Sequence, residues 1–314
     1  MLSILSVAKL FVFFSILCLT FGNNCPPPRT ILPCTCDESL STSYLCENIT
    51  SAETFFDIIE NTGGLSFNML FVHNSVLQYL PTSAIISENF KFLAIRNTEL
   101  DSLFDKPPTG KNSLDKIVLD NVTLHRNLQW DLFKGLTKLS RLEIYKTEVK
   151  SLGNDFKLNI SPNLRFLLMD NTNTMRLSKD AFENLNVLSG IVIKSSHIKV
   201  LKRSMFPKPA AIESLAFMNN KIEFLPDDIF SDMPKLWELI FSSNKISILK
   251  ESIFKDFSHH YCMLNVYDNP IKCGCELQWI VQGTMLQISG ECQDPEFRKG
   301  KRIESLMPND FGFC

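Results

Sequence analysis

The sequence predicts a solenoid of about nine tandem repeats that is closed at each end by a cysteine-rich segment. Apolar residues recur at positions 1, 4, 6, 11 and 14 of a unit, and the units begin at residues 67, 90, 114, 139, 164, 188, 212, 236 and 261. A period of this length is the signature of repeat architectures, in which each unit packs only against its neighbours. Cysteines cluster before the first unit and after the last, where a solenoid would otherwise expose its core.

Each unit is expected to hold one strand followed by a turn. Positions 4 and 6 alternate as residues of a strand do, so both point inward while positions 3, 5 and 7 point outward. Position 9 begins the turn, where a polar side chain can bond backbone groups that would otherwise be buried unpaired. Val122 occupies this position in the third unit, so we expect that unit to be locally looser. The other units carry Ser75, Thr98, Thr147, Thr172, Ser196, Asn220, Asn244 and Asn269 there.

A second recurring feature is an aromatic residue near position 19. We expect these rings to stack behind the strands as an internal spine, formed by Phe133, Phe156, Phe182, Phe206, Phe230 and Phe254. Before the first unit, Phe55, Phe56, Ile58 and Ile59 have helical spacing, which predicts a short helix after the N-terminal cysteines.

The chain divides into four segments. Residues 1–22 have an early positive charge, a short apolar run over 10–19 and small residues before a polar break, which is typical of a signal peptide. Residues 23–66 are the N-terminal cap and a connecting segment, 67–271 the repeats, and 272–314 the C-terminal cap. No later stretch is apolar enough to cross a bilayer and the chain ends without a hydrophobic tail, so we expect a secreted, extracellular protein without a membrane anchor.

Nine cysteines lie beyond the predicted signal peptide: a group of four near each end, and Cys262. In an oxidising compartment two groups of four indicate disulfides, although spacing alone leaves three pairings open in each. Zinc is the alternative, but both tight pairs are C-x-C rather than the C-x-x-C of most zinc sites. Cys262 is the odd thiol. It is either a half-buried free thiol or the site of an intermolecular disulfide to a partner chain.

The segments "LWELIFSSNKISILKESIF" and "IESLAFMNNKIEFLPDDIF" resemble the LxxLxLxxNxLxxLPxxxF unit of the extracellular leucine-rich-repeat family. This resemblance implies an α/β leucine-rich-repeat solenoid, curved, with parallel strands on its concave face. Both cysteine groups resemble the family's caps, with Pro270, Leu277 and Trp279 at the places the C-terminal motif has them. The resemblance implies the pairs Cys25–Cys36, Cys34–Cys46, Cys273–Cys292 and Cys275–Cys314. The layout is also similar to secreted arthropod proteins of the type of the non-catalytic subunit of oplophorid shrimp luciferase.

No pattern in the sequence indicates catalysis. The five histidines form no HExxH motif and no metal-ligand spacing, and the G-x-S-x-G and G-x-x-x-x-G-K-[ST] motifs are missing. We therefore expect no enzyme activity, no cofactor and no metal site. The formal net charge is −2 and no basic block interrupts the chain, so nucleic acid is not expected as a partner.

The predicted concave face carries aromatic and apolar residues beside charges of both signs, which suits an extracellular protein partner. The middle of this face, with Arg141, Glu143, Tyr145 and Phe166, is the predicted hot spot. The alternatives are that the apolar stripe only packs neighbouring strands, or that an edge or the convex side binds. The full predicted set is Phe71, His73, Phe92, Arg96, Arg141, Glu143, Tyr145, Phe166, Leu168, Asp170 and Lys194.

Three sequons predict N-glycosylation, at Asn48, Asn121 and Asn159. Asn121 is at position 8, at the edge of the concave face, whereas the other two are expected outside the strands. These features together favour a non-catalytic or regulatory subunit of an extracellular complex. A structural matrix protein is the second hypothesis, and an enzyme is the third.

Overall fold

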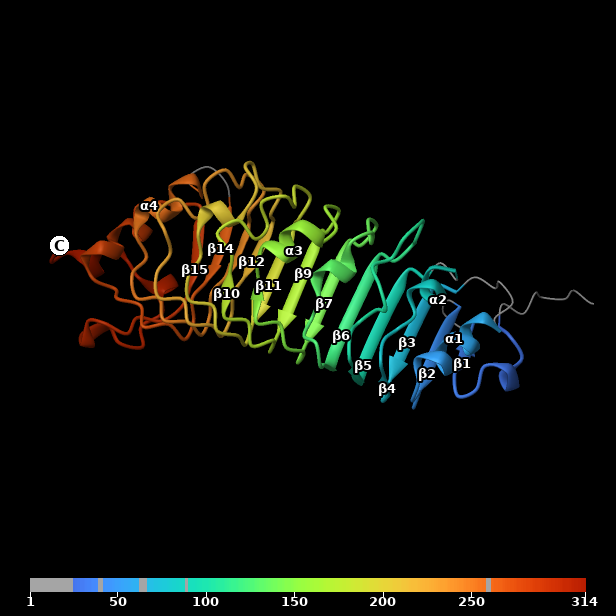
Figure 1. Ribbon diagram of the computed structural model, residues 1–314. Coiled ribbons are helices and arrows are strands. Elements are labelled where there is room, and N and C mark those ends of the chain that lie inside the picture. The colour runs from blue at the N-terminus through green and yellow to red at the C-terminus, as the bar shows by residue number, and fades with distance from the viewer. Residues whose placement is uncertain (1–24, 39–41, 62–66, 88–89, 258–260) are drawn as a thin grey trace, which may run out of the picture.

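The computed structural model describes residues 25–38, 42–61, 67–87, 90–257 and 261–314, so the predicted signal peptide lies outside it. The chain forms an elongated molecule in which strands follow one another from the N-terminal to the C-terminal end (Figure 1). The α-helices are short: α1 (Ala52–Glu60), α2 (Thr82–Ser87), α3 (Asn154–Asn159) and α4 (Glu251–Phe254). The 3-10 helices are Pro28–Thr30, Trp130–Phe133, Arg203–Met205, Lys255–Phe257, Cys275–Val281, Glu296–Arg298, Ile303–Ser305 and Pro308–Phe311.

Twelve strands follow one another across a 13-stranded main sheet, in the order β1-β2-β3-β5-β6-β7-β9-β11-β12-β13-β14-β15, and β4 pairs with β5. Only β1 and β2 pair antiparallel among these; the other pairs are parallel. The strands are β1 (Thr35–Asp37), β2 (Ser43–Glu47), β3 (Met69–His73), β4 (Val76–Leu77), β5 (Phe92–Leu100), β6 (Lys116–Leu124), β7 (Arg141–Tyr145), β8 (Ser151–Leu152), β9 (Phe166–Asp170), β10 (Arg176–Leu177), β11 (Gly190–Lys194), β12 (Ser214–Ala216), β13 (Glu238–Ile240), β14 (Cys262–Asn265) and β15 (Leu286–Ser289). This mostly parallel sheet with few helices is compatible with the predicted solenoid.

The strand register follows the predicted units. Arg141 of β7 pairs with Phe166 of β9, and Phe166 pairs with Gly190 of β11, so position 3 lies beside position 3 in successive units. Positions 4 and 6 point into the core, as Leu142 and Ile144 do in β7, with no exposed surface. Positions 3, 5 and 7 therefore lie on the other face of the main sheet, which we call the open face.

The sheet extends beyond the predicted repeats at both ends, by β1 and β2 at the N-terminal end and by β15 at the C-terminal end. In the N-terminal cap, β2 pairs in parallel with β3, and its inward residues are Tyr44 and Cys46, both fully buried. In the C-terminal cap, β15 pairs in parallel with β14. The boundaries drawn at residues 67 and 271 thus leave out three strands of the same sheet, β1, β2 and β15.

Asparagine at position 9 has the expected role in the last units. Asn244 accepts a hydrogen bond from the Ile222 backbone N–H at 3.0 Å and donates to the Phe217 carbonyl at 2.6 Å. The expectation for the third unit was wrong. Val122 lies inside β6, the pairing of β5 with β6 continues through Leu124, and the Val122 N–H donates to the Thr147 hydroxyl at 3.0 Å. A longer strand ladder here replaces the missing side-chain hydrogen bonds.

Aromatic rings pack behind the sheet as predicted, but the ring contacts among the described residues form two runs rather than one spine, from Trp130 to Phe206 and from Phe230 to Trp279. Phe156 lies 6.0 Å from Phe182, and Phe182 lies 5.7 Å from Phe206, measured between ring centroids. Phe254 continues the packing to Trp279 of the C-terminal cap, with centroids 5.6 Å apart. Helix α1 forms where helical spacing predicted it and buries Phe55, Ile58 and Ile59. One hydrophobic core therefore runs from cap to cap.

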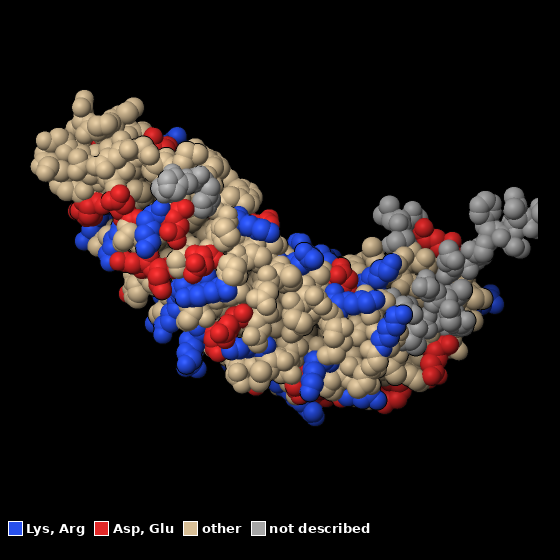
Figure 2. All heavy atoms as spheres, turned by 90° about the horizontal axis from the view of Figure 1, so that it is seen from above, with Lys and Arg blue, Asp and Glu red and all other residues tan. Residues whose placement is uncertain are grey.

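The caps are held by the disulfides Cys25–Cys36, Cys34–Cys46, Cys273–Cys292 and Cys275–Cys314, the pairing that the family resemblance implies. Charged side chains of both signs are interspersed over much of the face seen in Figure 2, whereas the C-terminal end, at the left, is mostly uncharged in this view.

Candidate functional site

The centre of the open face is organised around the carboxylate of Glu143. Its Oε1 atom accepts a hydrogen bond from Arg141 and lies 2.8 Å from Lys116 Nζ, while Oε2 accepts from the Tyr145 hydroxyl at 3.0 Å. Arg141 and Tyr145 occupy positions 3 and 7 of the same strand as Glu143, so the period of two places all three on one face. Lys116 reaches across from β6, where it pairs with Arg141 in the ladder.

This arrangement changes the acidity of two groups. Burial opposes ionisation of Glu143, which is only 7% exposed, but the hydrogen bonds from Arg141 and Lys116 outweigh it and lower its pKa. The pKa of Tyr145 is raised to about 12 by burial and by the neighbouring Glu143 carboxylate. Near neutral pH, Glu143 is thus an anion with two cationic partners, and Tyr145 stays a neutral donor.

Phe166 is held between two neighbouring strands. The guanidinium carbon of Arg141 lies 4.0 Å from the centroid of the Phe166 ring, which is a close cation–π contact. On the other side, a Cβ atom on Gly190 would lie 2.7 Å from Cδ2 of the ring, so only glycine leaves room for the observed position. Gly190 was missing from the predicted set. Its only signal is a glycine inside a strand, which often marks a close approach of another group.

A second group of predicted residues lies towards the N-terminal end of the open face. Phe71 and Phe92 meet edge to face with ring centroids 5.5 Å apart, and His73 packs against Phe71 at 6.0 Å. Burial, and then the charge of Arg96, lower the pKa of His73. Lys116 connects this group to Glu143, because its Nζ also lies 5.3 Å from the Phe92 ring. Lys116 was missing from the predicted set.

The remaining predicted residues extend the surface towards β11. Lys194 Nζ lies 3.1 Å from Asp170 Oδ2, and Leu168 is half-buried beside Glu143, with which it pairs in the ladder. Arg96 Nε lies 3.8 Å from Asp120 Oδ2. All eleven predicted residues are therefore on the open face, but they form neighbouring groups rather than one contiguous site.

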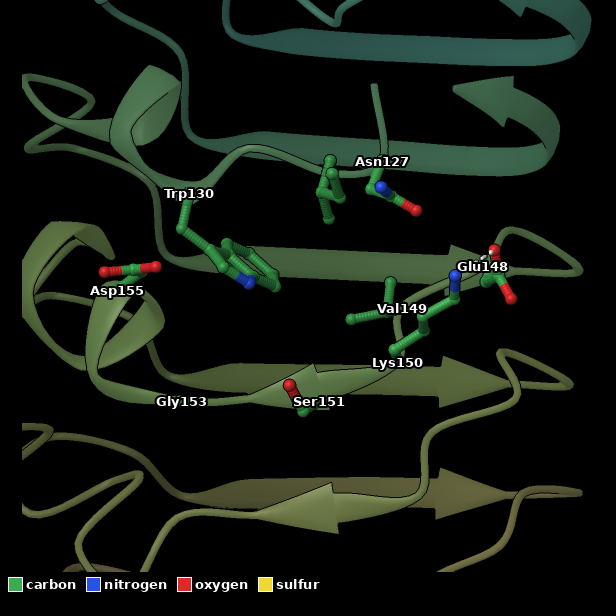
Figure 3. Close-up of a pocket in the computed structure, with 9 residues that line it drawn as sticks. Asn127, Trp130, Glu148, Val149, Lys150, Ser151, Gly153 and Asp155 are labelled. Carbon is green, nitrogen blue, oxygen red and sulfur yellow. Dashed lines mark ion pairs between the residues drawn. The ribbon is translucent and has the colours of Figure 1, made fainter. Parts of the chain in front are cut away.

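A hollow of 210 Å³ lies beside β8, and the Trp130 indole points into it (Figure 3). Asp155 lies at one end, and at the other Lys150 Nζ is 3.6 Å from Glu148 Oε2. The volume is below the ~300–1,000 Å³ of ordinary small-molecule sites, so it does not suggest a substrate pocket.

Among the described residues, no three histidine, cysteine or acidic side chains lie close enough together to hold a metal ion. None of the helices in the same residues is both long and apolar enough to span a bilayer.

Cys262 differs from the expected half-buried thiol. It has no exposed surface, and burial raises the pKa of its thiol to about 12. Disulfide exchange requires an accessible thiolate, so this geometry argues against the intermolecular disulfide considered above.

The three sequons differ from one another in their surroundings. Asn121 is exposed, and its Nδ2 donates to Asn97 Oδ1 at 2.9 Å. Asn48 directly follows β2 with the same left-handed backbone, so it is equivalent to Asn121 rather than remote from the sheet. Asn159 is at the end of α3, where Nδ2 donates to the Asp155 carbonyl at 2.8 Å.

The sequence matches no protein-family model, and it matches none of the curated proteins with which it was compared.

Proposed function

We propose that this chain is a secreted, non-catalytic leucine-rich-repeat protein that binds an extracellular protein partner through its open face. In this proposal the main sheet is the concave face of a solenoid with nine repeats. Three features support it: the unit-by-unit strand register, the disulfide at each terminus and the bowed outline of the molecule in Figure 2. The partner-binding role is that of a subunit in a larger complex.

The observation that carries the binding role is the cluster around Glu143. Every charge in this cluster is already paired within the chain, and Arg141 is fixed between Glu143 and the Phe166 ring. The aromatic and guanidinium side chains of this surface are therefore already ordered before a partner binds. Arginine and aromatic side chains held in this way are typical of interface hot spots, because less conformational entropy is lost on binding.

The proposal is tested by capturing partners from native extracellular fluid with the immobilised mature protein, and then measuring the affinity of the purified partner. Phe166→Ala should weaken binding about thirtyfold, which corresponds to a hot spot of about 2 kcal/mol. The matched control is Met263→Ala, since Met263 is also half-buried at position 3 on the open face but lies in β14, far from the cluster.

Equal affinity of wild type and Phe166→Ala would refute the role of the cluster. The matrix hypothesis predicts a different result in the same preparation, because the purified protein alone would form large assemblies in size-exclusion chromatography. If the protein stays monomeric and captures no partner, the result contradicts both the partner-binding proposal and the matrix hypothesis.

A further inference from the structure

A second surface lies on a different side of the core from the open face. Strand β10 pairs with β8 in a separate two-stranded sheet, and Leu177 of β10 packs against the same hydrophobic core as the main sheet. Between β10 and the turn that follows β11 is a hollow of 350 Å³, whose apolar lining includes Met175 and Val200. These side chains are 60% and 42% exposed, so the apolar part of the lining is open to solvent.

The charged side chains that line this hollow are all cationic. Arg176, Lys179, Lys199 and Lys202 line it, and no carboxylate does. In the described part of the chain none of the four forms an ion pair within 4.0 Å.

The carboxylates nearest in sequence are already engaged elsewhere. Lys157 Nζ lies 2.7 Å from Asp180 Oδ2 and 2.6 Å from Glu183 Oε2, so these acids are paired with a lysine of the preceding unit. The lining thus carries four positive charges and no carboxylate, which favours a negatively charged ligand.

Exposed apolar side chains continue from the hollow along the molecule. Phe224 and Ile248, at position 13 like Val200, are 58% and 41% exposed. Hydrogen bonds join these turns in order: the Lys221 N–H donates to the Ile198 carbonyl, and the Lys245 N–H donates to the Ile222 carbonyl, each at 2.8–2.9 Å. Exposed apolar side chains at one place in adjacent turns form a stripe, and contiguous apolar surface of this kind marks interaction sites.

We propose that this hollow and the stripe bind an extended, acidic segment of a protein partner that carries apolar side chains. The four cations supply charge complementarity, and the thioether of Met175 adapts to differently shaped apolar groups. An enclosed pocket would suit a free amphiphile, because small ligands are mostly buried in their sites. Met175 and Val200 in this hollow are open to solvent, and exposed apolar side chains continue beyond it, which favours an extended chain.

The proposal is tested by fluorescence anisotropy of the full mature protein with a labelled peptide in which glutamate alternates with leucine. Wild type should bind it, and Lys199→Glu combined with Lys202→Glu should weaken binding at least about tenfold, because two attractions become repulsions. The matched control reverses two other exposed lysines, Lys235→Glu with Lys255→Glu, and should leave the affinity within about twofold.

Two further probes decide between occupants. A peptide of alternating glutamate and serine should bind more weakly than the leucine peptide, since it has no apolar side chains to contact Met175 and Val200. Vesicles of anionic phospholipid should not bind. If wild type fails to bind the leucine peptide, if both double variants bind equally, or if only the vesicles respond to the Lys199 and Lys202 substitutions, the proposal is overturned.

Discussion

Glu143→Gln isolates the electrostatic part of the open-face cluster. Glutamine keeps the shape of the side chain, and its amide oxygen can still accept from Arg141 and Lys116. Its amide nitrogen can then donate to the Tyr145 hydroxyl, which reverses the direction of that hydrogen bond. The substitution therefore removes a charge with little change in packing.

The expected loss follows from the three hydrogen bonds to the carboxylate. The Tyr145 bond, now to a charged group and contributing about 1.5–3 kcal/mol, becomes a neutral one of about 1 kcal/mol. The Arg141 and Lys116 bonds keep their charged donors but lose ion pairing of about 0–1 kcal/mol each, so the total loss is roughly 0.5–4 kcal/mol before screening. The partner side chains of Arg141 and Lys116 are 43% and 32% exposed, which places the loss in the lower half of this range. We expect Glu143→Gln to lower the free energy of unfolding by about 1–2 kcal/mol at neutral pH.

Urea denaturation followed by circular dichroism measures this loss, since urea leaves the ionic strength low and the ion pairs unscreened. The folded-state pKa of Glu143 lies below its ordinary value of 4.5, so its stabilising contribution is present above that value and is lost as the pH falls through the lowered pKa. The difference between wild type and variant should therefore shrink below pH 4.5. Glu238→Gln changes a half-buried acid at position 3 whose hydrogen-bond donor is the neutral Ser214 hydroxyl rather than two cations, so it should cost less, about 0.5–1 kcal/mol. A Glu143→Gln variant as stable as wild type at neutral pH would refute the reasoning.

Three further outcomes are expected. Gly190→Ala should destabilise the protein by about 1–3 kcal/mol in urea denaturation, and most of this cost should vanish in a Phe166→Ala background, where the clashing ring is gone. Cys262 should resist iodoacetamide in the folded protein and react once urea unfolds it, as followed by mass spectrometry; rapid native labelling would contradict its burial. Asn244→Ala should cost about 3 kcal/mol, because it leaves the Ile222 N–H and other buried backbone groups unpaired, and a loss under 1 kcal/mol by denaturation would contradict that role.

The sequence predicted the strand register because inward positions 4 and 6 carry aliphatic residues in most units. The same aliphatic template explains why β2 was missed. There the inward positions hold Tyr44 and Cys46, which do not match the aliphatic template although they are fully buried. The prediction for Val122 failed because it considered only side-chain hydrogen bonds, whereas the β5–β6 ladder continues past this residue. Backbone pairing beyond position 9 leaves no trace in the apolar pattern.

The open-face cluster was predicted in part. Alternation along β7 placed Arg141, Glu143 and Tyr145 on one face without knowledge of the neighbouring strands. Lys116 and Gly190 were missed because their contributions depend on lateral distances between strands, which the sequence of a single unit does not contain. Lys116 reaches a carboxylate on the next strand, and Gly190 matters only because a neighbouring ring lies over it.

Both proposed surfaces include residues of one unit, which begins at residue 164. Phe166 lies on its open face, and Met175 lines the cationic hollow. Core side chains of this unit, such as Leu167, are fully buried. Because the core separates the surfaces and each presents its own residues, we expect a partner on the open face to leave the hollow free. Occupation of both at once would let the chain hold two proteins together, which is a scaffold role that a solenoid with a single binding face does not offer.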